Sequence, residues 1–239
     1  MLLELTGVSK AFDSLTAISD IDLQLGEAEA LGVIGPNGAG KTTLVNVITG
    51  DVTPNSGDVI FAGRSIAGLA PAERCRLGLG RTYQIPHPFG GMTVYENVLV
   101  GATFGDDRSE AEGSIIALEV LERTGLIGKA NALAGGLPLL DRKRLELARA
   151  LATGPRVLLL DEIAGGLTEH EVGDLIHVVK GLRAGGLSII WIEHVVHALM
   201  AVVDRLVAIS SGKLLMEGEP RAVMASREVR EVYLGISGE

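Results

Sequence analysis

The sequence feature that most restricts the fold of this chain is a glycine-rich motif between two apolar segments. The motif fits the pattern G-x-x-x-x-G-K-[ST] and consists of Gly35, Pro36, Asn37, Gly38, Ala39, Gly40, Lys41 and Thr42. The apolar run 30–34 before it predicts a buried strand, and residues 41–49 predict a helix that stops at Gly50. A glycine-rich loop between a strand and a helix lets successive backbone N–H groups surround a phosphate. The sequence therefore predicts a phosphate-binding loop.

The charged and hydroxyl groups of this motif indicate which kind of molecule carries the phosphate. The start of the predicted helix adds a favourable partial positive charge. We expect Lys41 to reach the β- and γ-phosphates of a nucleotide and the Thr42 hydroxyl to ligate Mg²⁺. Thr43, the next residue, is included in the predicted nucleotide-binding set. A GTPase is disfavoured because the chain contains no Asn-Lys-x-Asp motif.

Two adjacent acids follow another apolar run, 157–160, which predicts a buried strand. In open α/β sheets, ligands bind at the carboxyl ends of the strands. We expect Asp161 to hold Mg²⁺ through water and Glu162 to polarise the attacking water. Without the phosphate loop upstream, this strand and its two acids would be a weak signal.

Two further polar residues are candidates for the same edge. His194 follows the apolar run 188–192, and Gln84 follows a short predicted strand at 81–83. A histidine at a sheet edge can donate a hydrogen bond to a γ-phosphate oxygen, and we expect Gln84 to reach Mg²⁺ and the attacking water. Taken alone, neither residue specifies a function.

The alternation of short apolar runs with helical segments predicts an α/β fold with a mainly parallel sheet and helices on both faces. Segments 205–209 and 213–216 predict a hairpin around Ser210-Ser211-Gly212. Segment 92–152 lacks strand signals and predicts a helical insertion. Capping boxes at Thr93–Glu96 and Thr168–Glu171 predict two helix starts.

Composition excludes several functional classes. The net charge is −9 with no long basic run, which disfavours nucleic acid as a partner. The longest apolar stretch, 187–209, contains Glu193 and His194 among other polar residues, so no membrane span is predicted. We expect a cytosolic chain without a signal peptide. The single cysteine, Cys75, excludes an internal disulfide framework or a multi-thiolate metal site.

In this order, the phosphate loop, Gln84, RLELARAL at 144–151, LLLDE and IEH resemble the ATP-binding subunit of an ABC transporter. The resemblance extends from about Leu3 to Pro220. GPNGAGKTTLVNVITG and RKRLELARAL look most like the importers of branched-chain (hydrophobic) amino acids. The resemblance implies ATP and Mg²⁺ as ligands. It also implies one ABC ATPase domain over 1–239: a P-loop NTPase core, an antiparallel β subdomain, and a helical subdomain at 92–152.

The resemblance also assigns roles and partners. It implies that Phe12 stacks on adenine, that residues 84–92 sense the membrane subunits, and that His194 is a switch histidine. The implied partners are membrane permease subunits, a second ABC ATPase subunit, and indirectly a periplasmic or extracellular solute-binding protein. The departure at 137–141, described below, favours a different chain as that second subunit. The implied location is peripheral, at the cytoplasmic face of the inner membrane. The alternatives are a non-transport ABC ATPase and a regulatory cassette with reduced hydrolysis.

Two segments depart from the family pattern. Where the family has LSGGQ, this chain has Leu137-Pro138-Leu139-Leu140-Asp141, without the serine and both glycines. The nearby LAGGL at 133–137 is four residues out of register, about one helical turn. We expect Leu140 to crowd the approach of a partner's phosphate there. Ile163 also replaces the proline that more often follows the catalytic glutamate, which puts the rigidity of that loop in question.

Overall fold

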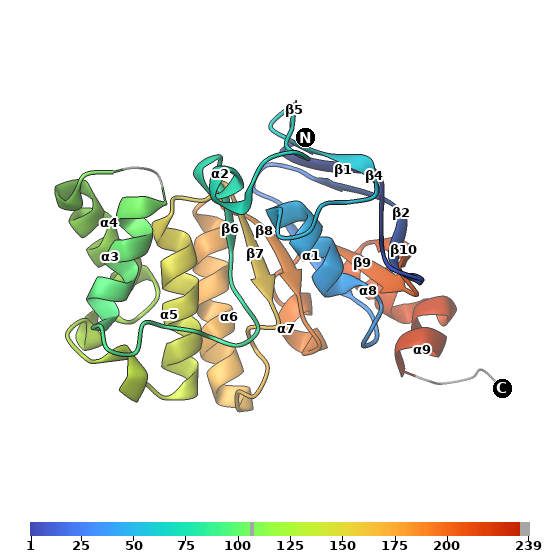
Figure 1. Cartoon of the computed structure of the whole chain (residues 1–239). Coiled ribbons are helices and arrows are strands. Elements are labelled where there is room, and N and C mark those ends of the chain that lie inside the picture. The colour runs from blue at the N-terminus through green and yellow to red at the C-terminus, as the bar shows by residue number, and fades with distance from the viewer. Residues whose placement is uncertain (106–107, 235–239) are drawn as a thin grey trace.

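The computed structural model describes residues 1–105 and 108–234. Residues 235–239, at the C-terminal end of the predicted domain, therefore lie outside the described residues. It confirms the expected α/β fold, which is built on two sheets (Figure 1). The larger sheet has the strand order β10-β9-β3-β8-β7-β6, and every pairing in it is parallel except that of β9 with β10. Its strands are β3 (Ala30–Ile34), β6 (Leu79–Arg81), β7 (Val157–Asp161), β8 (Ser188–Ile192), β9 (Arg205–Ser210) and β10 (Lys213–Gly218).

The smaller sheet is antiparallel, with the order β2-β1-β4-β5. Its strands are β1 (Leu3–Phe12), β2 (Leu15–Leu25), β4 (Ser56–Phe61) and β5 (Arg64–Ser65). Its apolar side chains form one buried cluster with α1 (Lys41–Thr49) and one face of the larger sheet, including Val33 and Leu159. Ile18 of β2 belongs to this cluster and lies against Gly40 at the start of α1, which positions the candidate site.

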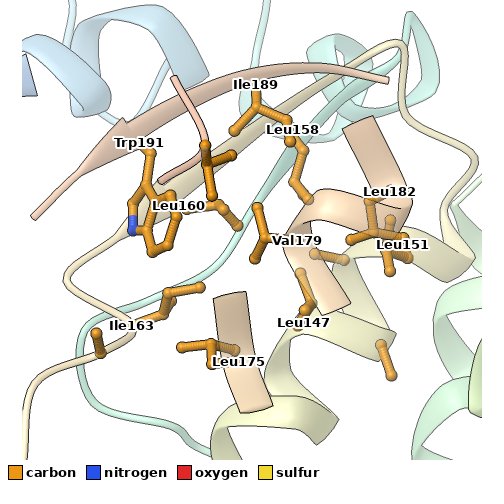
Figure 2. Packing of buried hydrophobic residues seen from close by; sticks show 14 of the residues in the cluster. Leu147, Leu151, Leu158, Leu160, Ile163, Leu175, Val179, Leu182, Ile189 and Trp191 are labelled. Carbon is orange, nitrogen blue, oxygen red and sulfur yellow. The ribbon is translucent and has the colours of Figure 1, made fainter. Parts of the chain in front are cut away.

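Helices α5 (Leu139–Ala152), α6 (Glu169–Ala184) and α7 (Val196–Met200) cover the other face of the larger sheet (Figure 1). Alternate residues of β7 point to opposite faces, so Leu158 and Leu160 meet the helices while Leu159 faces α1. Figure 2 shows the strand side chains against the helices, with these residues labelled: Leu147, Leu151, Leu158, Leu160, Ile163, Leu175, Val179, Leu182, Ile189 and Trp191. Because both faces are covered, β7 and β8 are nearly continuous apolar runs.

Segment 92–152 contains α3 (Val94–Phe104), α4 (Glu110–Arg123) and α5, and two short 3₁₀ turns, Ile127–Lys129 and Ala134–Gly136, lie between α4 and α5. The predicted capping box at α3 is confirmed. The Glu96 amide donates to Thr93 Oγ1 over 3.1 Å, and the Thr93 amide donates to Glu96 Oε2 over 2.7 Å. The box predicted at Thr168 is likewise present at the start of α6.

The predicted strand at 81–83 was two residues out of place, because β6 is Leu79–Arg81. Gly80 belongs to the strand, and a Cβ there would lie 2.9 Å from the Cβ of Pro155. This glycine therefore serves close packing, whereas in a sequence it signals a strand boundary.

The predicted hairpin is confirmed as β9 and β10. The remaining helices are α2 (Pro71–Arg76), α8 (Pro220–Ala225) and α9 (Arg227–Leu234). None of the helices in the described ranges is long and apolar enough to cross a membrane.

Candidate functional site

The glycine-rich loop 35–40 connects β3 to α1, as predicted. At two of its positions only glycine fits, because there is no room for a side chain. A Cβ at Gly35 would lie 2.3 Å from the Ile209 carbonyl oxygen, and a Cβ at Gly40 would lie 2.4 Å from that of Ala17. Gly40 also has a φ of 105°, a conformation that other residues rarely adopt. No side chain caps the start of α1, so its first N–H groups are available to an anion.

Lys41 lies against this loop and is 5% exposed. Its Nζ donates hydrogen bonds to the carbonyl oxygens of Gly35, over 2.7 Å, and Pro36, over 3.0 Å. Burial lowers the pKa of Lys41, whereas the carboxylates of Glu162 and Asp161 act in the opposite direction. The ammonium is therefore held at the loop, where phosphate oxygens would give it charged acceptors.

A cavity of about 420 Å³ opens beside the loop. Its volume falls in the range of small-molecule sites. It is lined by Phe12, Leu15, Thr16, Ala17, Asn37, Gly38, Ala39, Gly40, Lys41, Thr42, Thr43, Gln84 and Glu162. The structure thus brings together predicted residues from four separate parts of the chain. Phe12 is 46% exposed, and Lys10 Nζ lies 5.1 Å from its ring centroid.

Asp161 ends β7 and is almost fully buried. Its Oδ2 lies 3.2 Å from Arg81 Nη2. The other terminal nitrogen of this guanidinium, Nη1, lies 2.9 Å from Asp51 Oδ2. Burial raises the pKa of the Asp161 carboxyl, and Arg81 counteracts that effect. Arg81 was not among the predicted site residues, because nothing in a sequence shows that an arginine on one strand pairs with an acid on another.

The three predicted catalytic side chains meet at Glu162. Its Oε2 accepts from Gln84 Nε2 over 2.5 Å, and its Oε1 lies 2.7 Å from His194 Nε2. Glu162 has a φ of 49°, a left-handed conformation that is uncommon outside glycine and is often found at functional sites. The carboxylate, which follows β7, is therefore held between two groups that follow the neighbouring strands β6 and β8.

Lys143 of α5 is a site residue that the sequence analysis missed. It is 3% exposed, and its Nζ donates to the carbonyl oxygens of Gln84, over 2.7 Å, and Glu162, over 3.3 Å. Burial lowers the pKa of this lysine. A signal for it exists in the sequence, since Lys143 is four residues before Leu147 and therefore lies on the apolar face of the predicted helix.

The segment 137–141 forms the start of α5, with Pro138 as the residue before its first turn. Leu140, which we expected to crowd an approaching phosphate, is largely buried, at 9% exposed. The exposed leucine is its neighbour Leu139, at 42%. Asp141 is buried and pairs with Lys129 and Arg144. The helix start that replaces the expected signature is therefore apolar on its outer surface.

Another cavity, of about 510 Å³, lies at the opposite edge of the larger sheet. It includes Gly154 and Gly185, which follow the C-terminal ends of α5 and α6, together with Arg123 and Arg156. Helix C-termini carry partial negative charge, which the two arginines balance. The larger volume therefore does not indicate the reactive site, which lies at the carboxyl ends of the parallel strands.

A phosphate loop between β3 and α1 and an acidic pair at the end of β7 define a P-loop nucleotide-hydrolysing protein. The protein-family model for ABC transporters matches residues 18–165, and the chain belongs to this family. It is an ATPase cassette.

Curated relatives match almost the whole chain. Two branched-chain amino acid transport ATP-binding proteins, LivG of Salmonella typhimurium and BraF of Pseudomonas aeruginosa, are each 35% identical over 98% of both chains. A lipopolysaccharide export ATP-binding protein, LptB of Acidithiobacillus ferridurans, is 33% identical over 98% of this chain and 97% of its own.

Solved structures agree with this assignment. A nucleotide-free ATP-binding cassette of an ABC transporter superposes with a TM-score of 0.89, at 29% identity, over 100% of this chain and 99% of its own. A cassette in its ADP conformation gives a TM-score of 0.88 at 29% identity, over 98% and 99%. The fold of the ABC ATPase cassette is therefore present over the whole chain.

Proposed function

We propose that this chain is the ATP-hydrolysing subunit of an importer for branched-chain amino acids or a related small solute. The observation that carries the hydrolytic role is the placement of Glu162 between Gln84 and His194, beside the phosphate loop. The proposed solute class is supported by the full-length similarity to LivG and BraF.

ATP occupies the cavity beside Lys41 in this proposal. Phe12 stacks on adenine, the loop N–H groups and Lys41 hold the phosphates, and Thr43 lies at the start of the same helix. The phosphate end of the cavity carries the fixed positive charge that a triphosphate requires.

Mg²⁺ fits the oxygen donors at this edge, which are the Thr42 hydroxyl, the Gln84 amide and the Asp161 carboxylate. No cluster of three or more His, Cys, Asp or Glu side chains suited to a metal occurs among the residues that the structure describes. A magnesium ion held by these oxygen donors would share its coordination with phosphate oxygens and water. When bound, the ion neutralises charge on the phosphates.

In the hydrolytic step, Glu162 accepts a hydrogen bond from the attacking water and orients it toward the γ-phosphate. Gln84 positions the same water through its side-chain amide. His194, at the end of the neighbouring strand, donates to a γ-phosphate oxygen and stabilises the charge there. These roles use side chains that already touch one another.

The membrane permease binds near the loop 84–92 in this proposal. Apolar side chains in and beside this loop are exposed, including Ile85 at 65%, Phe89 at 45% and Met92 at 36%. Asn97 fixes the loop by accepting from the Phe89 amide over 2.9 Å and donating to its carbonyl over 3.1 Å. The chain is thus a peripheral subunit at the cytoplasmic membrane face, and a solute-binding protein outside acts on it only through the permease.

The second ATPase subunit is a different chain in this proposal, because the start of α5 lacks the signature glycines. A partner with an intact signature completes the site at Lys41, whereas this chain offers the partner's nucleotide the exposed Leu139. Removing one transition-state donor lowers a rate by about 10²-fold or more. Mutating the catalytic glutamate in each subunit separately tests this. Glu162→Gln should remove nearly all hydrolysis and the partner's change only part, whereas equal losses or a homodimer contradict the asymmetry.

The experiment for the transport role is isolation of the chain with its associated subunits from membranes, followed by reconstitution in lipid vesicles. We expect a permease and a second ATPase in the complex, and hydrolysis that rises when a binding protein loaded with leucine, isoleucine or valine is enclosed. A complex that contains ribosomal components and no permease contradicts the transport role. An intact transporter stimulated only by another cargo contradicts the proposed solute class.

A further inference from the structure

Glu193 is a fully buried carboxylate that has no part in the hydrolytic roles described above. It follows β8 directly and is 0% exposed. Both of its oxygens accept hydrogen bonds from backbone amides. Oε1 accepts from Ala164 over 2.6 Å, and Oε2 accepts from His194 over 2.9 Å and Val195 over 3.3 Å. One side chain therefore joins two loops.

These two loops carry the reacting groups. Ala164 is two residues beyond Glu162, and His194 is itself the other partner of the Glu162 carboxylate. By holding both loops, Glu193 fixes the distance between the backbones from which the carboxylate and the imidazole extend. The side chain of Glu193 is absent from the lining of the nucleotide cavity, so it acts on the chemistry through these loops.

The conformation of Glu162 explains why such support is needed. A left-handed φ in a residue other than glycine persists only where its surroundings determine it. The Glu162 amide donates to the Ile192 carbonyl over 2.9 Å, and its carbonyl accepts from Lys143 over 3.3 Å. The bond from Ala164 to Glu193 fixes the next part of the loop, so the strained residue is held on both sides.

We propose that Glu193 is a positioning residue for ATP hydrolysis, which holds the loop after Glu162 against the loop of His194 so that the two side chains meet. The proposal rests on the proposed role of Glu162 in orienting the attacking water. A carboxylate suits this task because it only accepts hydrogen bonds and has two oxygens, one for each loop. Burial lowers the pKa of Lys143 and the Glu193 carboxylate acts in the opposite direction, so the two groups interact electrostatically.

Glu193→Gln is the direct test, since it keeps the shape but turns one acceptor into an N–H₂ group that faces an N–H donor. The matched control is Ser188→Ala in the same strand. Ser188 is also buried and joins two backbone groups, by accepting from Ala28 and donating to Gly26, but at the opposite edge of the sheet. Both variants are prepared as the full chain in its membrane complex, and hydrolysis is expressed per folded molecule.

We expect Glu193→Gln to lower kcat about 10- to 100-fold, because a small misplacement of reacting groups has effects of this size. The KM for ATP should stay within about threefold, since the phosphate contacts are untouched. Ser188→Ala should retain the wild-type kcat. Glu193→Asp, which keeps both acceptors, should retain more kcat than Glu193→Gln and covers the case in which the glutamine variant folds poorly.

The double variant Glu162→Gln/Glu193→Gln separates positioning from a general structural effect. If Glu193 acts through Glu162, the double variant hydrolyses ATP no more slowly than Glu162→Gln alone. A multiplicative loss, a wild-type kcat in Glu193→Gln, or an equal loss in Ser188→Ala overturns the proposal. Wild-type hydrolysis in Glu162→Gln would instead overturn the proposed function on which it rests.

Discussion

His194 Nε2 lies 2.7 Å from Glu162 Oε1, although the two residues follow different strands. The register of the sheet produces this contact. β7 and β8 pair in parallel with Asp161 opposite Ile192, so the residues beyond each strand end leave the sheet side by side. The imidazole and the carboxylate are therefore brought together by strand pairing, and ATP binding is not required for them to meet.

Replacing His194 by alanine should slow hydrolysis while leaving nucleotide binding in place. In the proposed mechanism, His194 donates a hydrogen bond that stabilises the charge developing on the γ-phosphate during the reaction. Losing one such donor lowers a rate about 10²- to 10³-fold. Release of inorganic phosphate and binding of a fluorescent ATP analogue measure the two properties. A loss of binding as large as the loss of turnover contradicts the assigned role.

Lys41→Ala should lose most of the affinity for ATP, whereas Cys75→Ser should change it little. Lys41 holds an ammonium against the phosphate loop, and Cys75 is a partly buried thiol in α2. Equilibrium titration with labelled ATP compares the two variants with the wild type. Equal affinities in all three proteins are incompatible with the assigned phosphate loop.

Leu175→Ala should lower the free energy of unfolding by about 2–5 kcal/mol, the usual effect of such a cavity in a core. Leu175 is fully buried between α6 and the larger sheet (Figure 2). The control is Leu118→Ala on α4, where the side chain is 48% exposed. That variant should change stability by no more than about 0.5 kcal/mol. Urea unfolding curves measure both, and equal effects would contradict the described packing.

The titration of the Glu146 carboxyl should make the free energy of unfolding depend on pH. It is buried on α5, and burial raises the pKa of its carboxyl although Arg149 lies 3.2 Å away and acts in the opposite direction. A raised pKa in the folded state means that the folded chain binds the proton more tightly than the unfolded chain. The stability from this group is present below the ordinary pKa of glutamate and is lost as pH rises through the raised value.

The variant Glu146→Gln removes this titration. The unfolding free energy of the wild type relative to the variant should therefore fall as the pH rises from about 4 to neutrality, a range that starts near the ordinary glutamate pKa. Denaturant unfolding at a series of pH values gives the difference directly. A difference that rises with pH contradicts the stated shift.

The elements that the sequence predicted best are those whose signal is local. β3, β7 and β8 are buried on both faces, so each is a short apolar run with a polar or glycine boundary. The phosphate loop and the capping boxes depend on residues a few positions apart. The same holds for the acidic pair, because the end of a strand can be read from the sequence around it.

The contacts that the sequence did not predict join distant segments. Arg81 pairs with Asp161 because β6 lies beside β7, and Glu193 reaches Ala164 because β7 lies beside β8. The burial of Leu140 was also not predicted, since it depends on where α5 begins, directly after Pro138. Strand order and helix phase are properties of the whole fold, so these contacts required the structure.

The most direct test of the hydrolytic assignment is the turnover of Glu162→Gln in the assembled transporter, measured together with its affinity for ATP. Among the residues that the structure describes, Glu162 alone carries a carboxylate that touches both Gln84 and His194 at the nucleotide cavity. Removing one positioned base lowers a rate by about 10²- to 10⁴-fold. We expect a loss of that size with ATP binding retained. Turnover equal to that of the wild type would show that another group orients the water and would contradict the proposed mechanism.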